Sequence, residues 1–299
     1  MSASLAGGAQ QLAEHLAARL GLRRRPRSWG GNCPSCGYHA AFTVRLPRKG
    51  KFPLLWCANG CTREQLAEAA QRALNTASRP PVPLAPLALA EQRARKLEAA
   101  RKLFAGAIAI RPDCPAGLYL AHRGVPHLVG CPGLRFRPDC WHPESKGHVR
   151  AMVAEVLDAA GRPLGVHRTY LKGDGRKADV QPQKASLGPI RGGAVRLDPA
   201  AAELTVGEGI ESAASAGVML GLPAWAAISA GNLASGLELP PEVRVVAIAA
   251  DHDGPGRKAA IEASVRWRAE GRTVRLAIPS GKGVDFNDLL RTRLAAEAR

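Results

Sequence analysis

The chain has 299 residues, and its 42 Lys and Arg side chains outnumber 25 Asp and Glu side chains, which gives a formal net charge of +17. This length excludes a single small domain and fits two or three. The positive charge favours a polyanionic partner such as nucleic acid, although a GC-rich genome would also raise the Arg content. Aromatic residues are only 4% of the chain, so we expect phosphate contacts rather than base stacking to supply most of the affinity.

The sequence carries no sign of membrane association or secretion. No apolar run approaches the roughly 18 residues of a membrane span. Met1–Gly8 has no basic residue ahead of a hydrophobic block, as a signal peptide would. We therefore expect a cytoplasmic protein, in which the cysteines are thiols or metal ligands rather than disulfides.

The N-terminal part predicts two helices on either side of a cysteine-bearing segment. Gln10–Leu22 has the leucine spacing of an amphipathic helix. A basic segment, Arg23–Arg27, follows it. Thr62 followed by Gln65 is the pattern of a capping box, so a second helix should begin there.

Two close cysteine pairs predict a structural zinc site. Twenty residues separate the pair Cys33 and Cys36 from the pair Cys57 and Cys61. Four soft ligands at this spacing suit one tetrahedral Zn²⁺ ion. His39 could replace Cys36 as a ligand, and the sequence leaves that choice open.

The residues between the cysteine pairs predict a two-stranded ribbon. Phe42–Leu46 and Phe52–Trp56 are the expected strands, and the tip between them carries basic side chains, among them Arg48 and Lys49. A run of charge is usually only a solvated surface. Beside a zinc site in so basic a chain, it is also a candidate for gripping a nucleic-acid strand.

The middle of the chain is irregular. Asn75–Pro86 is rich in proline and predicts a semi-rigid linker. Leu89–Ala107 predicts a helix, and strands are expected at Met152–Leu157 and Leu164–Leu171. Three tryptophans are expected to pack inside the protein: Trp141, Trp225 and Trp267.

From Glu203 onward, strands and helices alternate. Strands are expected from Glu203 and over Ala224–Ile228, Val243–Ala249 and Thr273–Ile278. Helices are expected over Ile210–Leu220, over Gly256–Glu270 and at the end of the chain. This alternation implies a parallel sheet that is covered by helices on both faces.

Three carboxylates stand where two of these strands end: Glu208, Asp251 and Asp253. Ligands of open α/β sheets gather at the carboxyl ends of the strands. Three carboxylates that meet there would hold Mg²⁺ or Mn²⁺, which prefer oxygen ligands. Glu208 has a glycine on each side, which lets the backbone turn sharply and lets a substrate approach. The alternative is that these side chains cap the helices that follow them.

In their order along the chain, these motifs resemble those of bacterial and phage DNA primases. The segments that look like the Toprim signature are Glu208-Gly209, Asp251-His-Asp253 and Asp285-Phe-Asn-Asp288. Upstream, Gly161–Leu171 resembles the basic motif that precedes Toprim, and the cysteine ribbon resembles the zinc-binding domain of the same enzymes. The family often has histidine where Cys36 stands, and the spacing of the second cysteine pair also departs from it. Both departures indicate a divergent, mobile-element type.

The resemblance implies an α/β protein in four segments. A β-rich zinc ribbon would occupy residues 1–75, and a linker with a helix residues 76–100. A mixed α+β basic subdomain would occupy residues 101–200. A Toprim domain with a Rossmann-like parallel sheet would occupy residues 201–299.

The resemblance also implies site residues. Glu208, Asp251 and Asp253 would be catalytic and would bind Mg²⁺ or Mn²⁺, with Asp285 as a further ligand. The side chains that would hold the triphosphate or the template are His167, Arg168, Lys177, Lys184, Arg48 and Lys49. A structural Zn²⁺ would be bound by Cys33, Cys36, Cys57 and Cys61.

The implied function is that of a DNA primase, a nucleotidyltransferase that makes short RNA primers on single-stranded DNA from nucleoside triphosphates. No Walker motif is present, so a helicase would act in trans. Two alternatives remain. One is a recombination mediator that joins a zinc site to a Toprim fold without enzymatic activity, and the other is a Toprim nuclease.

Overall fold

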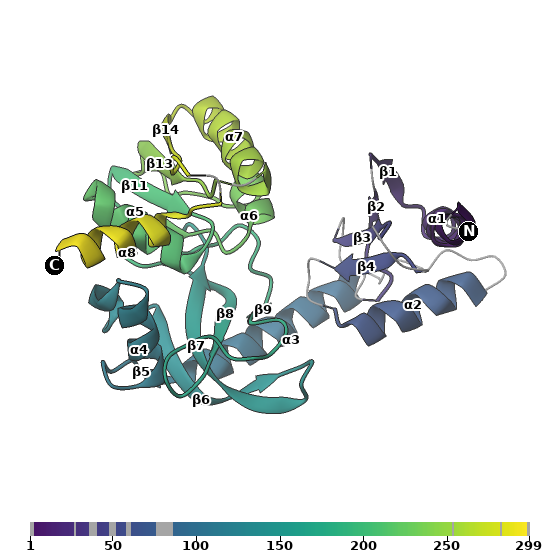
Figure 1. Cartoon of the computed structure of the whole chain (residues 1–299), viewed down its shortest axis with the longest axis horizontal. Coiled ribbons are helices and arrows are strands. Elements are labelled where there is room, and N and C mark those ends of the chain that lie inside the picture. The colour runs from purple at the N-terminus through teal and green to yellow at the C-terminus, as the bar shows by residue number, and fades with distance from the viewer. Residues whose placement is uncertain are drawn as a thin grey trace. The chain divides into compact units, whose positions relative to one another are not determined.

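The structure is a computed structural model. It describes residues 3–26, 28–35, 41–47, 52–57, 61–75, 86–252, 254–281 and 283–297. These residues form two compact units, Met1–Gln92 and Arg93–Arg299 (Figure 1). Within the described ranges, no helix is long and apolar enough to cross a membrane.

The first unit is an antiparallel sheet with two helices on one face. Its strands, in spatial order, are β1 (Arg23–Arg25), β2 (Ser28–Gly31), β3 (Phe42–Arg45) and β4 (Leu54–Cys57). Its helices are α1 (Ala3–Arg19) and α2 (Arg63–Asn75). Every second strand residue points to the helices, so Trp29, Phe42 and Val44 are buried with Leu16 of α1 and Leu66 of α2.

Several local predictions for this unit are confirmed. The two ribbon strands form, and Thr62 and Gln65 form the capping box. The backbone amide of Gln65 donates to Thr62 Oγ1 at 3.2 Å, and the backbone amide of Thr62 donates to Gln65 Oε1 at 3.0 Å. The first helix begins at Ala3 rather than at Gln10. The basic segment after it is partly an edge strand, because Arg23–Arg25 pairs with β2.

A long helix, α3 (Pro86–Ala105), leads into the second unit, close to the predicted Leu89–Ala107. The predicted linker, Asn75–Pro86, lies almost wholly outside the described residues.

The second unit contains an antiparallel sheet followed by a parallel one. The antiparallel sheet has the order β5 (Ile108–Ala109), β6 (Leu134–His142), β7 (Gly147–Leu157), β8 (Pro163–Leu171) and β9 (Lys184–Leu187). Two short helices accompany it, α4 (Pro115–His122) and the 3₁₀ helix η1 (Pro126–Leu128). One face of the sheet packs on α3, where Phe104 meets Val153 and Tyr170.

The second sheet has the alternating pattern that the sequence predicts. Its spatial order is β10 (Val195–Arg196), β12 (Ala224–Ala226), β11 (Glu203–Gly207), β13 (Val245–Ala249) and β14 (Thr273–Ala277). Its helices are α5 (Ile210–Leu220), α6 (Ala230–Ser235), α7 (Gly254–Ala269) and α8 (Phe286–Glu297). All neighbours are parallel except β10, and α5 with α8 covers the face opposite to α6 and α7 (Figure 1).

The two sheets of this unit are joined into one body. Ala194 exchanges backbone hydrogen bonds with Leu157 of β7, and the next residue, Val195, pairs with Ala226 of β12. One hydrophobic core also spans both sheets, and it contains Phe136 and Met152 as well as residues of α5. The relative placement of side chains on the two sheets is therefore fixed by packing.

Candidate active site and metal centre

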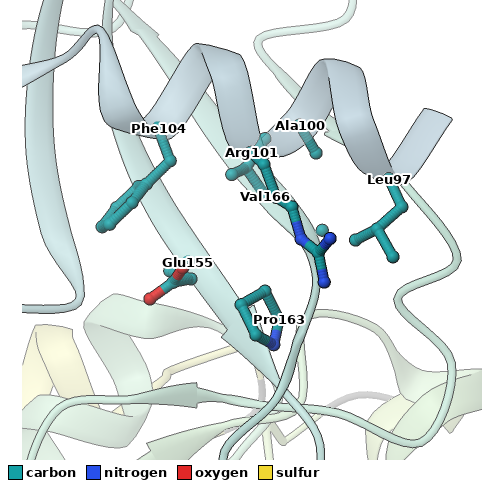
Figure 2. Close-up of a pocket in the computed structure, with 8 residues that line it drawn as sticks. Leu97, Ala100, Arg101, Phe104, Glu155, Pro163 and Val166 are labelled. Atoms are coloured by element: carbon teal, nitrogen blue, oxygen red, sulfur yellow. The ribbon is translucent and has the colours of Figure 1, made fainter. Parts of the chain in front are cut away.

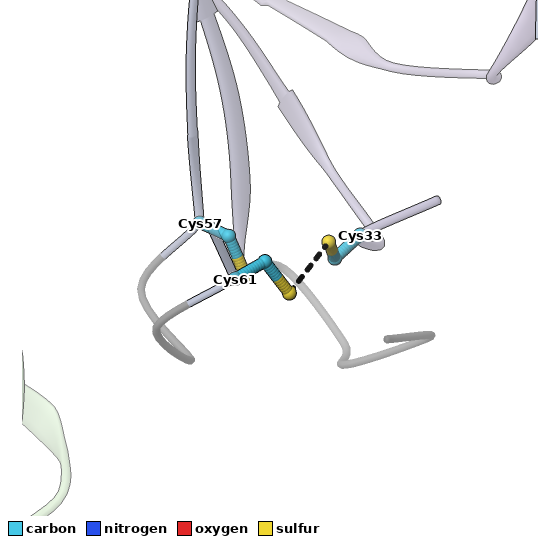
Figure 3. A group of neighbouring side chains, drawn as sticks. All are labelled: Cys33, Cys57 and Cys61. Carbon is cyan, nitrogen blue, oxygen red and sulfur yellow. Dashed lines mark hydrogen bonds between the residues drawn. The ribbon is translucent and has the colours of Figure 1, made fainter. Parts of the chain in front are cut away.

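Three cysteines of the first unit form a metal-binding cluster. Cys33 follows β2, Cys57 ends β4 and Cys61 precedes α2, and their sulfur atoms all lie within 4.8 Å of one another (Figure 3). The Cys33 and Cys61 sulfurs are 3.8 Å apart. That distance is too long for a disulfide. It matches the edge of a tetrahedron, about 3.8 Å, when each Zn–S bond is about 2.3 Å.

The three thiols therefore fit three corners of a tetrahedral zinc site. Cys36 and His39, the rivals for the fourth corner, lie outside the described residues. Which of the two completes the site stays a prediction.

The face of the first sheet that points away from its helices is basic and aromatic. We call this surface, formed by Arg23, Arg25, Arg45, Leu54 and Trp56, the outer ribbon face; the strand register brings these residues to one side. The Trp56 side chain is 61% exposed. Arg25 lies across the sheet, because a Cβ on Gly30 would stand only 2.5 Å from its guanidinium carbon. The predicted contacts Arg48 and Lys49 lie outside the described residues.

In the second unit, two predicted carboxylates lie at one edge of the parallel sheet. The register pairs Gly207 of β11 with Ala249 of β13. Glu208 is therefore one residue, and Asp251 two residues, beyond a matched pair on adjacent strands. Both residues are half-buried. The third carboxylate, Asp253, lies outside the described residues.

Glu208 is not the N-cap residue of α5. That position is Gly209, which has no side chain to cap the helix. Gly207 is required for packing, because a Cβ there would lie 2.9 Å from backbone atoms of Ala213. Glu208 thus stands between a glycine that brings α5 close to β11 and a glycine that starts the helix.

Asp285 does serve as a helix cap. Its Oδ1 accepts the Asp288 amide at 2.8 Å, and Asp288 Oδ2 accepts the Asp285 amide at 3.4 Å. Capping engages one oxygen, so a further role of Asp285 as a metal ligand stays a prediction. Among the residues that the structure describes, the cysteine cluster is the only group of three His, Cys, Asp or Glu side chains whose ligand atoms all lie within 4.8 Å of one another.

The neighbour of Asp285 in the same motif, Asn287, is structural and was not singled out from the sequence. It is 1% exposed. Its amide nitrogen donates to Ser215 Oγ at 3.0 Å and to the carbonyl of Arg123 at 2.5 Å. Asn287 thereby ties α8 to α5 and to the end of α4.

The predicted basic residues divide between the two faces of the antiparallel sheet. In the strand register, Lys184 of β9 lies opposite Thr169 of β8, and Lys177 forms an isolated β-bridge with Leu171. Both lysines therefore lie on one face of the sheet, which we call the lysine face. Arg168 points to the other face, where it is buried and donates to the carbonyls of Trp141 and Ala185. The described contacts of Arg168 are therefore internal, and its role toward a substrate stays a prediction.

His167 also lies on the lysine face, but as a neutral group. It is 8% exposed and shares a hydrogen bond of 3.0 Å with Ser186 Oγ. Burial, and then the nearby Lys184 ammonium, lower its pKa from 6.5 to about 3, against the opposing effect of Glu211. The role of His167 toward a substrate or template stays a prediction.

The lysine face meets the parallel sheet through a buried carboxylate, Glu211, in the first turn of α5. Lys184 Nζ donates to Glu211 Oε2 at 2.8 Å, and the Tyr119 hydroxyl of α4 donates to Oε1. Burial acts to raise the pKa of Glu211, but the Lys184 charge and the two hydrogen bonds outweigh it and lower the pKa to about 2. Glu211 was missed from the sequence, although it is the only charged residue of α5.

Comparison with known proteins identifies the parallel sheet. Residues 203–296 match the Toprim domain family. This part of the chain is a Toprim domain. The expectation from Glu208-Gly209 and from the Asp251 segment is thus confirmed for the fold. Residues 94–197, which hold the lysine face, match a domain of unknown function (DUF7146). No curated protein matches the chain.

Several of the solved structures that are similar to this chain are primases. The Escherichia coli primase catalytic core is 19% identical over 69% of this chain and 77% of its own, with a TM-score of 0.41. The primase fragment of the bacteriophage T7 primase-helicase is 15% identical over 91% of this chain and 98% of its own, with a TM-score of 0.43. The zinc-binding and RNA polymerase domains of Aquifex aeolicus primase are 16% identical over 100% of this chain and 84% of theirs, with a TM-score of 0.42.

One tryptophan departs from prediction. Trp225 and Trp267 are buried, but Trp141 is 48% exposed. It lies near the turn of the β6–β7 hairpin, between the buried residues Cys140 and His142, and its ring meets that of His148 edge-on with centroids 5.4 Å apart. By strand register this pair lies on the lysine face, which therefore extends from Lys184 to an exposed aromatic ring.

A recess on the opposite side of the same sheet is not a nucleotide site. Leu97 and Phe104 of α3 line it together with Glu155 and Pro163 (Figure 2). Its space is about 160 Å³, open solvent included. Small-molecule pockets are about 300–1,000 Å³. The Toprim edge and the lysine face are therefore better candidates for a nucleotide and a polymer.

We expect elemental analysis of the purified protein to find about one zinc per chain, since a structural site has four ligands. Cys57→Ser should release the metal because it removes a buried thiol of the cluster. Cys114→Ser, a half-buried thiol of the second unit, is the matched control and should retain it. Zinc loss from Cys36→Ser but not from His39→Gln would assign the fourth ligand, and zinc retained in Cys57→Ser would refute the site.

We expect His167 to make stability depend on pH. Its folded pKa of about 3 is below the unfolded 6.5, so the unfolded state binds the proton first and stability falls as pH drops below 6.5. Between pH 6.5 and 5 the loss should be about 2 kcal/mol. His167→Gln should lack this loss, so denaturant unfolding of the two proteins should converge as pH falls. A constant difference between them would contradict the assignment.

Proposed function

We propose that this protein is a DNA primase that makes short RNA primers on single-stranded DNA by metal-dependent nucleotidyl transfer. The observation that carries the proposal is the placement of Glu208 and Asp251 at the carboxyl edge of adjacent Toprim strands. Lys184 and Lys177 belong to the same compact unit and lie on the sheet that packs against this domain. Carboxylates for a cation and lysines for phosphates are the two requirements of phosphoryl transfer.

Glu208 and Asp251, with Asp253 as the predicted third ligand, would hold Mg²⁺ or Mn²⁺. Bound there, the cation would lower the pKa of the attacking 3′-hydroxyl and offset charge on the leaving pyrophosphate. The new bond joins the 3′-oxygen to the α-phosphorus. The bond between that phosphorus and the oxygen that bridges it to the β-phosphate breaks, and pyrophosphate leaves. The protein contributes the fixed positions of these carboxylates on neighbouring strands.

The lysine face would bind the triphosphate. Lys184 has three ammonium hydrogens and gives one of them to Glu211, while its side chain stays 32% exposed. Burial, and then the charge of Lys184, lower the pKa of Lys177, which lies near enough to Asp285 of the Toprim domain to feel its charge. An anion between these lysines would relieve their mutual repulsion.

The outer ribbon face would hold the template strand. It combines exposed arginines, which suit phosphates, with the exposed ring of Trp56, which suits an unpaired base. Stacking thus has more to contribute than the low aromatic content of the chain suggests. A helicase acting in trans remains part of the proposal.

Primer synthesis tests the proposal. The purified protein, a single-stranded template, labelled ribonucleoside triphosphates and Mg²⁺ or Mn²⁺ should give short oligoribonucleotides. Glu208→Gln and Asp251→Asn should each lower the yield at least about 100-fold, because each removes a negative charge that would hold the catalytic cation. Glu203→Gln, at the opposite end of β11 from Glu208, is the matched control and should remain active. DNA binding without product would favour the recombination mediator, and a shortened template would favour the nuclease.

The outer ribbon face predicts a second result. Trp56→Ala should weaken single-stranded DNA binding about 5- to 100-fold, in line with the worth of one stacked base. Arg45→Gln should lower the slope of log affinity against log salt by about 0.7. Arg63→Gln is the control, because this exposed arginine starts α2 and lies on the covered side of the sheet. Titrations by fluorescence anisotropy at several salt concentrations measure both effects, and equal affinities of Trp56→Ala and Arg63→Gln would refute this surface.

A further inference from the structure

We propose that Glu211 is a positioning residue that holds Lys184 as a phosphate-binding cation beside the acidic Toprim edge. The inference rests on the proposed function and deepens it. Glu211 follows Glu208 by three residues, and Lys184 lies on the separate antiparallel sheet. The ion pair between them therefore links the phosphate-binding part of the site to the strand end that carries the predicted metal ligands.

Glu211 itself does not fit the role of a metal ligand. One carboxylate oxygen accepts the Tyr119 hydroxyl and the other accepts Lys184. The residue is only 7% exposed. Both oxygens are therefore committed to the interior, and the cation would be left to the half-buried Glu208 and Asp251.

Lys184 benefits from this partner because a second cation lies near it. The Lys177 ammonium is within electrostatic range of the Lys184 charge, and the Arg123 guanidinium, which also acts on Lys177, stands 5.4 Å from the Tyr119 ring centre. Without a fixed negative charge, a lysine among cations would turn toward solvent. Glu211 holds the ammonium in place and leaves two of its three hydrogens for a phosphate.

A purely structural ion pair is the alternative, and nucleotide binding separates the two. Binding of Mg²⁺–GTP to the full chain should be measured by equilibrium dialysis for the wild type, Lys184→Gln, Glu211→Gln and the double variant. Each single variant should bind about tenfold more weakly. The double variant should bind no more weakly than Lys184→Gln, because Glu211 acts through that lysine. Additive losses, or wild-type binding by a folded Glu211→Gln, would overturn the proposal.

Two further variants keep the test decisive. Tyr119→Phe retains the Glu211 charge and should bind the nucleotide as the wild type does, even if its melting temperature falls. Should Glu211→Gln fail to fold, Glu211→Asp takes its place. Its shorter carboxylate cannot reach both partners, so we expect weaker binding, and unchanged binding would overturn the proposal. Glu262→Gln breaks an exposed ion pair with Lys258 on α7 and is the matched control.

The dialysis result does not depend on primer synthesis. A wild-type protein that binds Mg²⁺–GTP but makes no primer would refute the proposed function and leave the positioning role standing. In an active protein, Glu211→Gln should raise the KM for triphosphates more than it lowers kcat, because the chemistry at Glu208 and Asp251 is untouched. A loss confined to kcat would contradict positioning of a phosphate ligand.

Discussion

The organisation of the second unit depends on a charge in its interior. A buried carboxylate is costly unless it is paired and hydrogen-bonded. Glu211 obtains its partners from two other elements, Tyr119 of α4 and Lys184 of β9. The Glu211 carboxylate therefore has both of its partners only when the antiparallel sheet and α4 pack against the Toprim domain in this one arrangement. Substitution of Lys184 would leave an uncompensated charge inside the protein, and loss of the Tyr119 hydroxyl would remove one hydrogen bond from that charge, so the two contacts favour this arrangement.

The geometry of parallel strands explains why charges of opposite sign collect at one side of this unit. The strands β11 and β13 end at the same edge of the sheet, which brings Glu208 and Asp251 to that edge although they are far apart in the sequence. The lysine face lies on a sheet that shares its core with the Toprim domain. The carboxylates and lysines repel within each group, and a cation with a triphosphate would neutralise both groups at once.

Much of this fold follows from local pattern, and what failed was set by tertiary contacts. The bounds of α5 and the capping box of Thr62 and Gln65 need only nearby residues, and both are confirmed. Trp141 was expected to be a core or packing residue, but its side chain is 48% exposed, because it alternates along β6 with the buried Cys140 and His142 and points to the opposite side of the hairpin. Glu211 was missed because its partners are distant in sequence. The sequence does show a single charged residue in an apolar helix, but it does not show which residues that charge contacts.

The net charge of the chain overstates the positive charge that is available to a partner, because several arginines are engaged internally. Arg196 donates to the carbonyls of Asp158 and Ala159 and lies over the Trp225 ring. Arg272 donates to the carbonyl of Leu239 in the same way. Guanidinium groups suit this role because they offer several donors in a plane. Composition alone cannot separate such residues from Arg45, whose exposed position on the outer ribbon face leaves it able to meet a phosphate. The charges that matter for binding are those that the fold leaves exposed beside an aromatic ring or an acidic edge.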